Sequence, residues 1–360
     1  MLKNFWYACE LSSAITSKPK RVTMLNQEFV LYRNSQKEVV ALNDVCPHRG
    51  AALSNGWVED DCIRCPYHGW KYQADGTCIK IPANQPGVPI PKRARIDTYP
   101  VQEKYGFVWL FWGDIPEKER PPLPSLPEFG APGWRAVYGQ LHWNTHYTRV
   151  LENAIDISHV PFIHVNSIGS GIADQPRIEE YDVSIGEWSG SATVTASQSN
   201  KTKGFWKTIL SKQGSRPLSV TLSFYMPNIS RLEFGFSIGH FRIILFIIHV
   251  PIDDRTTMSK WIVLRNFITV PLADGDARKR ALKTMLEDKP IIESQNPKII
   301  PNDLTSELHA PSDNLSIAYR KLRKKCLDMG WGMESHLSQS DYTNSHVAEP
   351  SQDLAIAKVF

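Results

Sequence analysis

The feature that most constrains this chain is a pair of Cys-and-His motifs near its N-terminus. Cys46 and His48 are one residue apart, and sixteen residues later Cys65 and His68 follow with two residues between them. Two thiolates can bind one iron of a [2Fe-2S] cluster while two neutral imidazoles bind the other, an arrangement that uses one Cys and one His from each of two loops. Two alternatives stay open: a zinc site that uses Cys62 and Cys65 as a C-x2-C pair, or unrelated surface side chains. The spacing favours the iron-sulfur cluster, because a zinc knuckle does not need a C-x-H and a C-x2-H of this form.

The composition is that of a folded protein with about two domains. The chain has 360 residues, 42% of them hydrophobic, which is enough for a sizeable core. Its net charge of +4 is a small excess that does not imply nucleic acid as a partner. The most apolar stretch, 241–250, is far shorter than the roughly 20 residues of a membrane helix, and we expect it to be a buried strand. The N-terminus shows no signal-peptide pattern, so we expect a cytoplasmic protein without a membrane span.

Strand signals and a proline cluster divide the chain. Residues 1–115 carry short alternating or apolar runs separated by Gly, Asn and Asp, which predicts an all-β domain. The prolines of 116–127 can continue neither a helix nor a central strand. We therefore expect a first domain over 1–120 and a second over 121–332. Residues 333–360 are rich in Ser, Gln and Asp and are expected to form a flexible tail.

The second domain mixes strands and helices. Two runs with clean period-2 alternation, 218–225 and 231–238, predict half-buried antiparallel strands. The helices predicted from apolar spacing are 141–157, 274–293 and 312–329.

A second candidate metal site lies in and just beyond the first of these helices. Asn153, Asp156 and His159 are spaced three apart, which would put them on one helix face. His164 follows the helix end expected at Pro161. Two imidazoles joined by a carboxylate from elsewhere would form a 2-His-1-carboxylate triad, which leaves open positions on Fe(II) for dioxygen. Alone, a D-x2-H-x4-H pattern more often reflects capping and buried polar residues, but the motif upstream makes the iron site the stronger interpretation.

The cluster motifs resemble those of a known family. CPHRG at 46–50 and CPYHGW at 65–70 are similar to the Rieske domain of the Rieske non-heme iron oxygenases. Respiratory Rieske proteins have a disulfide at the positions held here by Ala51 and Tyr67, and a Ser donor where Trp70 stands. The resemblance therefore implies an oxygenase-type cluster of lower reduction potential than the respiratory centre.

The resemblance also implies roles around the second motif, because the family's D-x2-H-x4-H pattern is matched in full. His159 and His164 would bind the mononuclear iron, and Asp156 would bridge the two metal centres. Asn153 would lie close to the ligands without being one.

The third iron ligand is expected within 287–295. The E-D-x4-E-x-Q pattern of this segment resembles the monooxygenase and demethylase branch, which includes vanillate O-demethylases and caffeine N-demethylases. In that branch the Asp of the pair binds iron, so Asp288 is the expected ligand, with Glu287 and Glu293 as alternatives. Pro290 is expected to open the helix where a carboxylate could turn toward the histidines.

For the whole chain the resemblance implies an α+β fold, with an N-terminal all-β Rieske [2Fe-2S] domain and a C-terminal helix-grip catalytic domain, an antiparallel sheet wrapped on helices. It also implies a head-to-tail homotrimer in which the partner subunit's His68 contacts Asp156.

The basic run 320–325 is expected to be a solvated helix face, with docking of an acidic reductase or ferredoxin as the functional alternative.

The implied activity is that of a terminal oxygenase. Electrons from NAD(P)H would arrive through a reductase or ferredoxin, and dioxygen would be used at Fe(II) to hydroxylate or oxidatively demethylate a small organic substrate. A monooxygenase is favoured over a cis-dihydroxylating, ring-hydroxylating dioxygenase. The alternative is an electron carrier or binding protein whose helix-grip domain lacks mononuclear iron, with two irons per chain instead of three.

Overall fold

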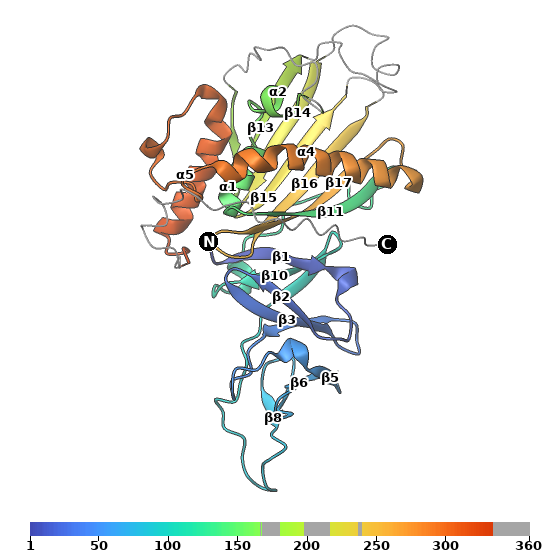
Figure 1. Cartoon of the computed structure of the whole chain (residues 1–360), viewed down its shortest axis with the longest axis vertical. Coiled ribbons are helices and arrows are strands. Elements are labelled where there is room, and N and C mark those ends of the chain that lie inside the picture. The colour runs from blue at the N-terminus through green and yellow to red at the C-terminus, as the bar shows by residue number, and fades with distance from the viewer. Residues whose placement is uncertain (166, 168–180, 198–216, 237–239, 334–360) are drawn as a thin grey trace.

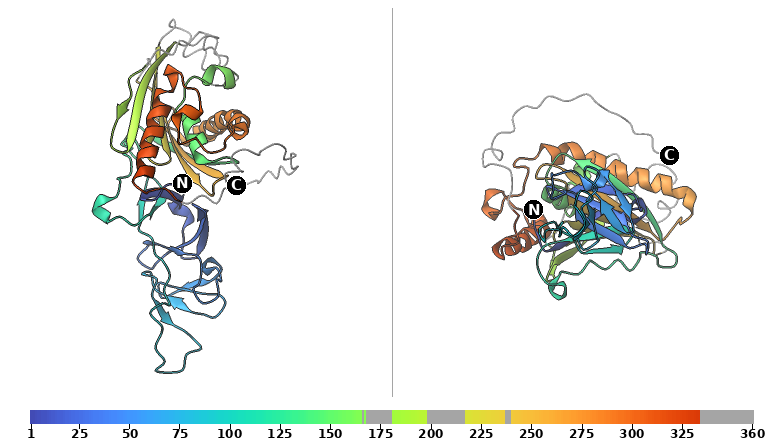
Figure 2. Two further views of the ribbon diagram at one scale, coloured as in Figure 1. Left: turned by 90° about the vertical axis from the view of Figure 1, so that its left-hand side faces the viewer. Right: turned by 90° about the horizontal axis from the view of Figure 1, so that it is seen from below.

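The chain forms two parts that lie end to end along its longest axis (Figure 1, Figure 2). In this computed structural model the described residues are 1–165, 167, 181–197, 217–236 and 240–333. The predicted tail, 333–360, therefore lies outside the described residues from residue 334 onward.

Three small antiparallel sheets make up the N-terminal part. Strands β2, β3 and β4 form one sheet, β5 to β8 form the second, and β1, β10 and β9 form the third. The bounds are β1 Phe5–Leu11, β2 Lys20–Met24, β3 Gln27–Arg33, β4 Val39–Asn43, β5 Trp57–Glu59, β6 Cys62–Arg64, β7 Lys71–Tyr72, β8 Cys78–Lys80, β9 Val101–Lys104 and β10 Phe107–Trp112. The prediction of an all-β first part is confirmed.

A seven-stranded antiparallel sheet in the order β11-β17-β16-β15-β14-β13-β12 forms the C-terminal part. The bounds are β11 Arg135–Trp143, β12 Ser184–Ile185, β13 Ser189–Ser197, β14 Pro217–Tyr225, β15 Ile229–Gly235, β16 Arg242–Pro251 and β17 Thr257–Arg265. The two predicted alternating strands are β14 and β15, which pair in the register Leu222 to Leu232. The second of them ends at Gly235, and residues 237–239 lie outside the described part. The apolar stretch 241–250 forms the buried strand β16, as expected.

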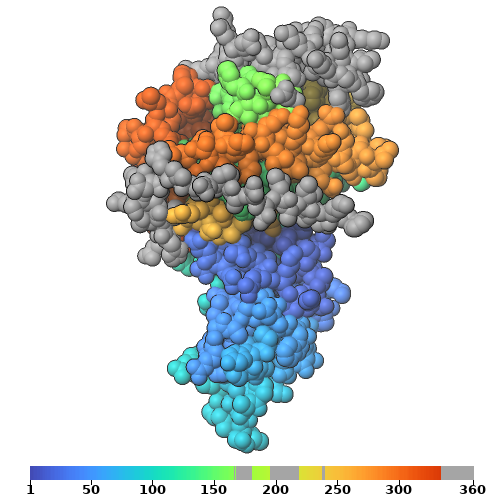
Figure 3. All heavy atoms as spheres, viewed as in Figure 1, coloured from blue at the N-terminus to red at the C-terminus, as the bar shows by residue number. Residues whose placement is uncertain are grey.

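Helices cover the large sheet. The bounds are α1 Tyr147–Ala154, α2 Val160–Ile163, α4 Asp274–Ser294 and α5 Asn314–Asp328, with short 3-10 turns at Ser12–Ala14, Leu53–Asn55, Glu117–Glu119, Pro271–Ala273, Leu304–Ser306 and Pro311–Asp313. Helix α4 crosses the strands (Figure 1) and buries Ala281, Met285 and Ile292 against the side chains of Trp143 and Trp261. Its outer side faces solvent (Figure 3), and the segment around α2 lies directly beside it. In the described part of the chain, no helix has the length and apolar character that a membrane crossing needs.

The prediction of a helix over 141–157 is wrong at its start. Residues up to Trp143 belong to β11, where Leu141 pairs with Ser259 of β17. The helix begins only at Tyr147, after His146, whose Nδ1 accepts a hydrogen bond from the Thr148 amide as an N-cap. Pairing with β17 decides the conformation here, because apolar spacing over a short run does not separate a strand from a helix.

Neither proline expected to interrupt a helix does so. Pro161 lies in the first turn of α2, where its missing N–H costs nothing and its φ suits the helix. Pro290 lies inside α4, which continues to Ser294. Because Pro290 and Leu286 are exposed, solvent can bind the Leu286 carbonyl that the proline leaves without a helical partner.

The hydrophobic cores of the two parts are unequal. The largest cluster joins Trp109 of β10, Phe246 of β16 and Tyr319 of α5, so the sheet that contains β1 packs on the C-terminal part. A separate, smaller cluster surrounds Cys46 and Cys65 at the far end of the N-terminal part. The Cys-and-His loops therefore stand on a small core of their own.

The basic run 320–325 is only partly a solvated face. Arg320 and Arg323 are buried, and Arg320 pairs with Glu152 of α1 and with Glu307. The three lysines of the run are exposed. The prediction was wrong for the arginines, because a helix of this amphipathic pattern turns part of any basic run toward the domain.

We predict that Arg320→Ala lowers the stability of the C-terminal part by about 3–5 kcal/mol, because the buried Glu152 carboxylate would lose its closest partner and keep only Arg149 Nη1 at 3.6 Å. Lys324→Ala is the matched control, since Lys324 forms an exposed pair with Asp328 that is worth well under about 1 kcal/mol. Thermal unfolding of both variants measures the difference. Equal unfolding temperatures would contradict a structural role for Arg320.

Candidate metal centres

The two Cys-and-His motifs lie on two similar tight loops. In each loop a glycine amide donates to the cysteine carbonyl, Gly50 to Cys46 at 2.8 Å and Gly69 to Cys65 at 3.0 Å. Both glycines have left-handed φ angles, +71° and +68°. A side chain would strain either position, so glycine after the histidine is what lets each loop close.

The loops bring the four predicted cluster ligands together as two pairs. Cys46 and Cys65 are buried in the same small hydrophobic cluster. The His48 and His68 rings lie 4.6 Å apart. His48 Nδ1 is buried and has no hydrogen-bond partner among the described residues. Two thiols on one side and two imidazoles on the other fit a two-iron cluster with one pair on each iron.

Aromatic residues flank this site. The Tyr72 hydroxyl lies 3.2 Å from Cys46 Sγ, and the Trp70 ring stacks on His48 with centroids 4.5 Å apart. A hydroxyl that donates to a ligand sulfur stabilises the reduced, more negative cluster, so Tyr72 would raise its potential.

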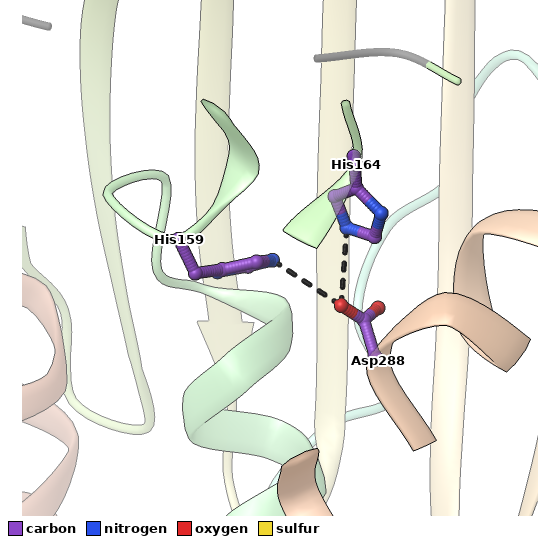
Figure 4. Close-up of side chains that lie close together, drawn as sticks. All are labelled: His159, His164 and Asp288. Atoms are coloured by element: carbon purple, nitrogen blue, oxygen red, sulfur yellow. Dashed lines mark ion pairs between the residues drawn. The ribbon is translucent and has the colours of Figure 1, made fainter. Parts of the chain in front are cut away.

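The second site joins His159 and His164 of the C-terminal part to a carboxylate from α4 (Figure 4). Asp288 Oδ1 lies 3.0 Å from His164 Nε2 and 3.5 Å from His159 Nε2. One ligand atom from each residue lies within 4.8 Å of the others, and no other group of His, Cys, Asp and Glu in the described residues converges in this way. Asp288 Oδ1 is buried and has no hydrogen bond of regular geometry from a described residue. Three converging ligand atoms, one an unsatisfied carboxylate oxygen, fit a single divalent ion.

Asp156 and His159 do not lie on a helix face, contrary to the prediction. Helix α1 ends at Ala154, and both residues belong to the turn that leads to α2. Asp156 Oδ1 accepts from the Ser158 amide at 2.7 Å and from its hydroxyl at 2.6 Å, while Oδ2 lies 3.3 Å from His159 Nδ1. This turn, and not helical periodicity, brings the aspartate beside the histidine.

The remaining candidates lie away from the point where the three ligand atoms meet. Glu287 lies behind His164, with Oε2 2.9 Å from His164 Nδ1. Glu293 accepts from the Asn144 amide at 2.6 Å. No side-chain hydrogen bond joins Asn153 to the three converging residues in the described part of the structure.

The site carries more negative than positive charge. Burial would lower the pKa of His164, but the carboxylates of Asp288 and Glu287 hold it above its ordinary value. Burial would raise the pKa of Asp156, but His159 and Ser158 hold it below its usual range. Carboxylates that stabilise positive charge on imidazoles without a metal can stabilise a divalent cation instead, since the metal replaces protons on its ligands.

Comparison with known sequence families settles what kind of protein has these two sites. A profile of the Rieske [2Fe-2S] domain matches residues 5–100, and the profile of the vanillate O-demethylase oxygenase C-terminal domain matches residues 143–329. The chain belongs to the Rieske oxygenases of this type. The zinc alternative for the cysteines is thereby excluded, because the matched domain is an iron-sulfur domain.

Individual relatives and a solved structure agree with this assignment. Methylxanthine N3-demethylase NdmB of Pseudomonas putida is 30% identical over 338 residues, which cover 90% of this chain and 89% of that protein. The putative toluene-4-sulfonate monooxygenase iron-sulfur subunit TsaM2 of Comamonas testosteroni is 33% identical over 189 residues, and the match spans about half of it, 54%. The solved structure of an NdmA mutant of Pseudomonas putida with theobromine superposes with a TM-score of 0.75 at 26% identity and covers 93% of this chain and 97% of that chain.

The comparisons confirm the predicted α+β architecture and enzyme class. This Rieske oxygenase is an enzyme of the monooxygenase type, its cofactors are a Rieske [2Fe-2S] cluster and a mononuclear iron, and its electrons come from a reductase. They support the oxygenase interpretation and not the electron carrier.

The sequence did not reveal the role of two residues at these sites. Tyr72 was not singled out, although strand alternation would place a residue two positions beyond Trp70 on the same side of the chain as that tryptophan. Glu287 was considered as an alternative iron ligand or as a residue of a solvated helix face, because nothing in its spacing shows that it lies behind His164.

We predict that Tyr72→Phe lowers the reduction potential of the cluster by an amount on the order of tens of millivolts, because a hydrogen bond to a ligand sulfur is lost. Tyr32→Phe is the matched control, since the buried Tyr32 hydroxyl donates to the Asp61 carbonyl and not to a ligand. Redox titration of the cluster measures both variants. An equal shift in the two would contradict a specific effect of the Tyr72 hydroxyl.

Proposed function

We propose that this Rieske oxygenase inserts one oxygen atom into a methyl C–H bond of a small aromatic compound. His159, His164 and Asp288 would bind the mononuclear iron. The convergence of these three ligand atoms carries the proposal, because three protein ligands on one side of an iron leave its other positions open to dioxygen. When bound, the iron supplies the oxidation chemistry, and the protein residues orient their ligand atoms and hold the charge.

The cluster would be bound by Cys46, His48, Cys65 and His68. The buried thiol pair and the neighbouring imidazole pair support this assignment. Its role would be to hold one electron from a reductase or ferredoxin and pass it to the mononuclear site. The exposed lysines at 321, 324 and 325 support docking of an acidic electron donor.

The substrate class is inferred from the relatives. Toluene-4-sulfonate, methylxanthines and vanillate, which name related proteins or the matched domain, are aromatic molecules that carry a methyl group on carbon, nitrogen or oxygen. Hydroxylation of a methyl group on nitrogen or oxygen gives an unstable product that releases formaldehyde, so one reaction accounts for both hydroxylation and demethylation.

The two centres would work together between subunits. The strand β6 beside the cluster loops and the helix α2 beside the iron site lie near opposite ends of the chain (Figure 1). The exposed side chains of Tyr67, next to His68, and of Phe162, between the two histidines, support a contact that joins one end to the other in a head-to-tail homotrimer. In this assembly the partner subunit's His68 would hydrogen-bond to Asp156.

The organisation of the chain follows from the same proposal. The Rieske domain would comprise 1–120 and the catalytic domain 121–332, with 333–360 as a tail.

We place the enzyme in the cytoplasm, where NAD(P)H-dependent reductases could supply its electrons. Asn153 would lie close to the iron ligands without binding the metal itself.

The function is tested with purified protein, a surrogate reductase, NADH and a panel of aromatic O-methyl, N-methyl and C-methyl compounds. We expect three irons per chain, formaldehyde from the O- and N-methyl substrates, and one atom of labelled dioxygen in each hydroxylated product. Asp288→Ala should lose one iron per chain and all turnover but keep a reducible cluster. Two irons in the parent protein, or full activity in Asp288→Ala, would contradict the proposed site.

Asp156→Asn tests the bridge between subunits. We expect it to keep both metals and the trimer, because an amide has nearly the same shape and neither iron loses a ligand. Turnover should fall by at least about 100-fold, because an amide can present a donor where the carboxylate accepts from two imidazoles. In a single turnover with pre-reduced cluster, dioxygen should leave the cluster reduced in the variant and oxidise it in the parent.

Asp253→Asn is the control for this experiment. Asp253 also accepts from backbone amides of its own turn, those of Arg255 and Thr256. If Asp156 only stabilised its turn, both variants would keep normal cluster oxidation and product yield, and the bridge would be refuted.

A further inference from the structure

The most informative feature beyond the proposed ligands is how His164 is held. The ring is 1% exposed, and each of its nitrogens faces a carboxylate. Nε2 lies 3.0 Å from Asp288 Oδ1, and Nδ1 lies 2.9 Å from Glu287 Oε2. Two consecutive residues of α4 therefore contact the two nitrogens of one imidazole. The Glu side chain is one methylene longer than Asp, which lets it reach the far nitrogen.

Glu287 is itself fixed in place. The Ser167 hydroxyl donates to the same Oε2, in a short hydrogen bond, and Lys283 Nζ lies 3.7 Å from Oε1 one turn earlier on α4. The Glu287 side chain is only 19% exposed. These contacts argue against the simpler interpretation of Glu287 as a solvated residue of the helix.

The contact determines the state of the imidazole. A carboxylate is only an acceptor, so Nδ1 carries a hydrogen toward Glu287, and Nε2, which faces Asp288, is the nitrogen at which a metal ion would take the place of a proton. A neutral imidazole ligand with its other nitrogen bound to a carboxylate is more basic and better oriented toward a metal.

We propose that Glu287 is a positioning residue for the mononuclear iron: it fixes the tautomer and orientation of His164 and adds negative charge behind it. This inference rests on the proposed iron site. His159 has a less regular contact, with Asp156 Oδ2 3.3 Å from its Nδ1. The Glu287 contact lies wholly within one chain, so it pre-forms the His164 side of the site.

The test compares metal affinity in Glu287→Ala, Glu287→Gln and the control Glu293→Gln. Glu293 lies on the same helix but binds the Asn144 amide. Each protein is freed of mononuclear iron by mild chelation that spares the cluster, and Fe(II) is added back anaerobically against a competing chelator. The readout is iron bound in excess of the cluster, together with cluster content and unfolding temperature.

We expect Glu287→Ala to bind Fe(II) about 10- to 100-fold more weakly than the parent. Glu287→Gln should recover much of this loss, because an amide oxygen still accepts from Nδ1 although the charge is gone. A side chain that only stabilised the helix would show no such recovery in affinity. Glu293→Gln should bind as the parent does.

Two failures are distinguishable. Equal Fe(II) affinity in the parent, Glu287→Ala and Glu287→Gln would overturn the role of Glu287 and leave the iron site intact. If the parent itself bound no third iron, or Asp288→Ala bound it as well as the parent, the proposed iron site would be wrong, and the role of Glu287 with it.

Discussion

The candidate iron site of this enzyme depends on the position along its axis at which α4 packs on the seven-stranded sheet. Asp288 must reach two histidines that precede it by more than 120 residues, and it does so because Met285 and Ile292, on either side of it, are buried in the cluster that contains Trp143 and Trp261. Burial of large apolar side chains fixes the helix to within a fraction of a turn, since interiors are closely packed. A shift of one residue along the helix would exchange Asp288 with Glu287 or Lys289 at the proposed iron site.

The two candidate metal centres differ in how far apart their residues lie along the chain. This difference decides how much of each site can be predicted from the sequence. The proposed cluster ligands come from two tight loops within a span from Cys46 to His68, so their spacing reports their geometry directly. The proposed mononuclear site joins a turn to a distant helix, and no spacing encodes that contact. Asp288 could be singled out only through resemblance to a family. The orientation of Glu287 toward His164 is visible only in the three-dimensional structure.

Errors in the sequence interpretation have the same origin, because tertiary contacts decide where local patterns are ambiguous. The run to Trp143 is a strand because β17 pairs with it, and Asp156 reaches His159 through a turn stabilised by Ser158. Arg320 belongs to a basic run that was predicted to be solvated, but it is buried because it forms ion pairs with the carboxylates of Glu152 and Glu307. By contrast the alternation of β14 and β15 was read correctly, since a sheet with one buried face imposes period 2 on its sequence.

The two histidines of the proposed iron site, His159 and His164, differ in a way that suits the proposed assembly. His164 is 1% exposed and its Nδ1 partner, Glu287, is tied to α4 and Ser167, so this half of the site belongs to the interior. The side chains of His159 and Asp156 are 16% and 28% exposed, so this half reaches the surface. An electron donor on another subunit could touch only the His159 side. In the proposed enzyme the fold would thus separate two demands on the site, with rigid metal binding on the buried side and access for electrons through Asp156 on the other.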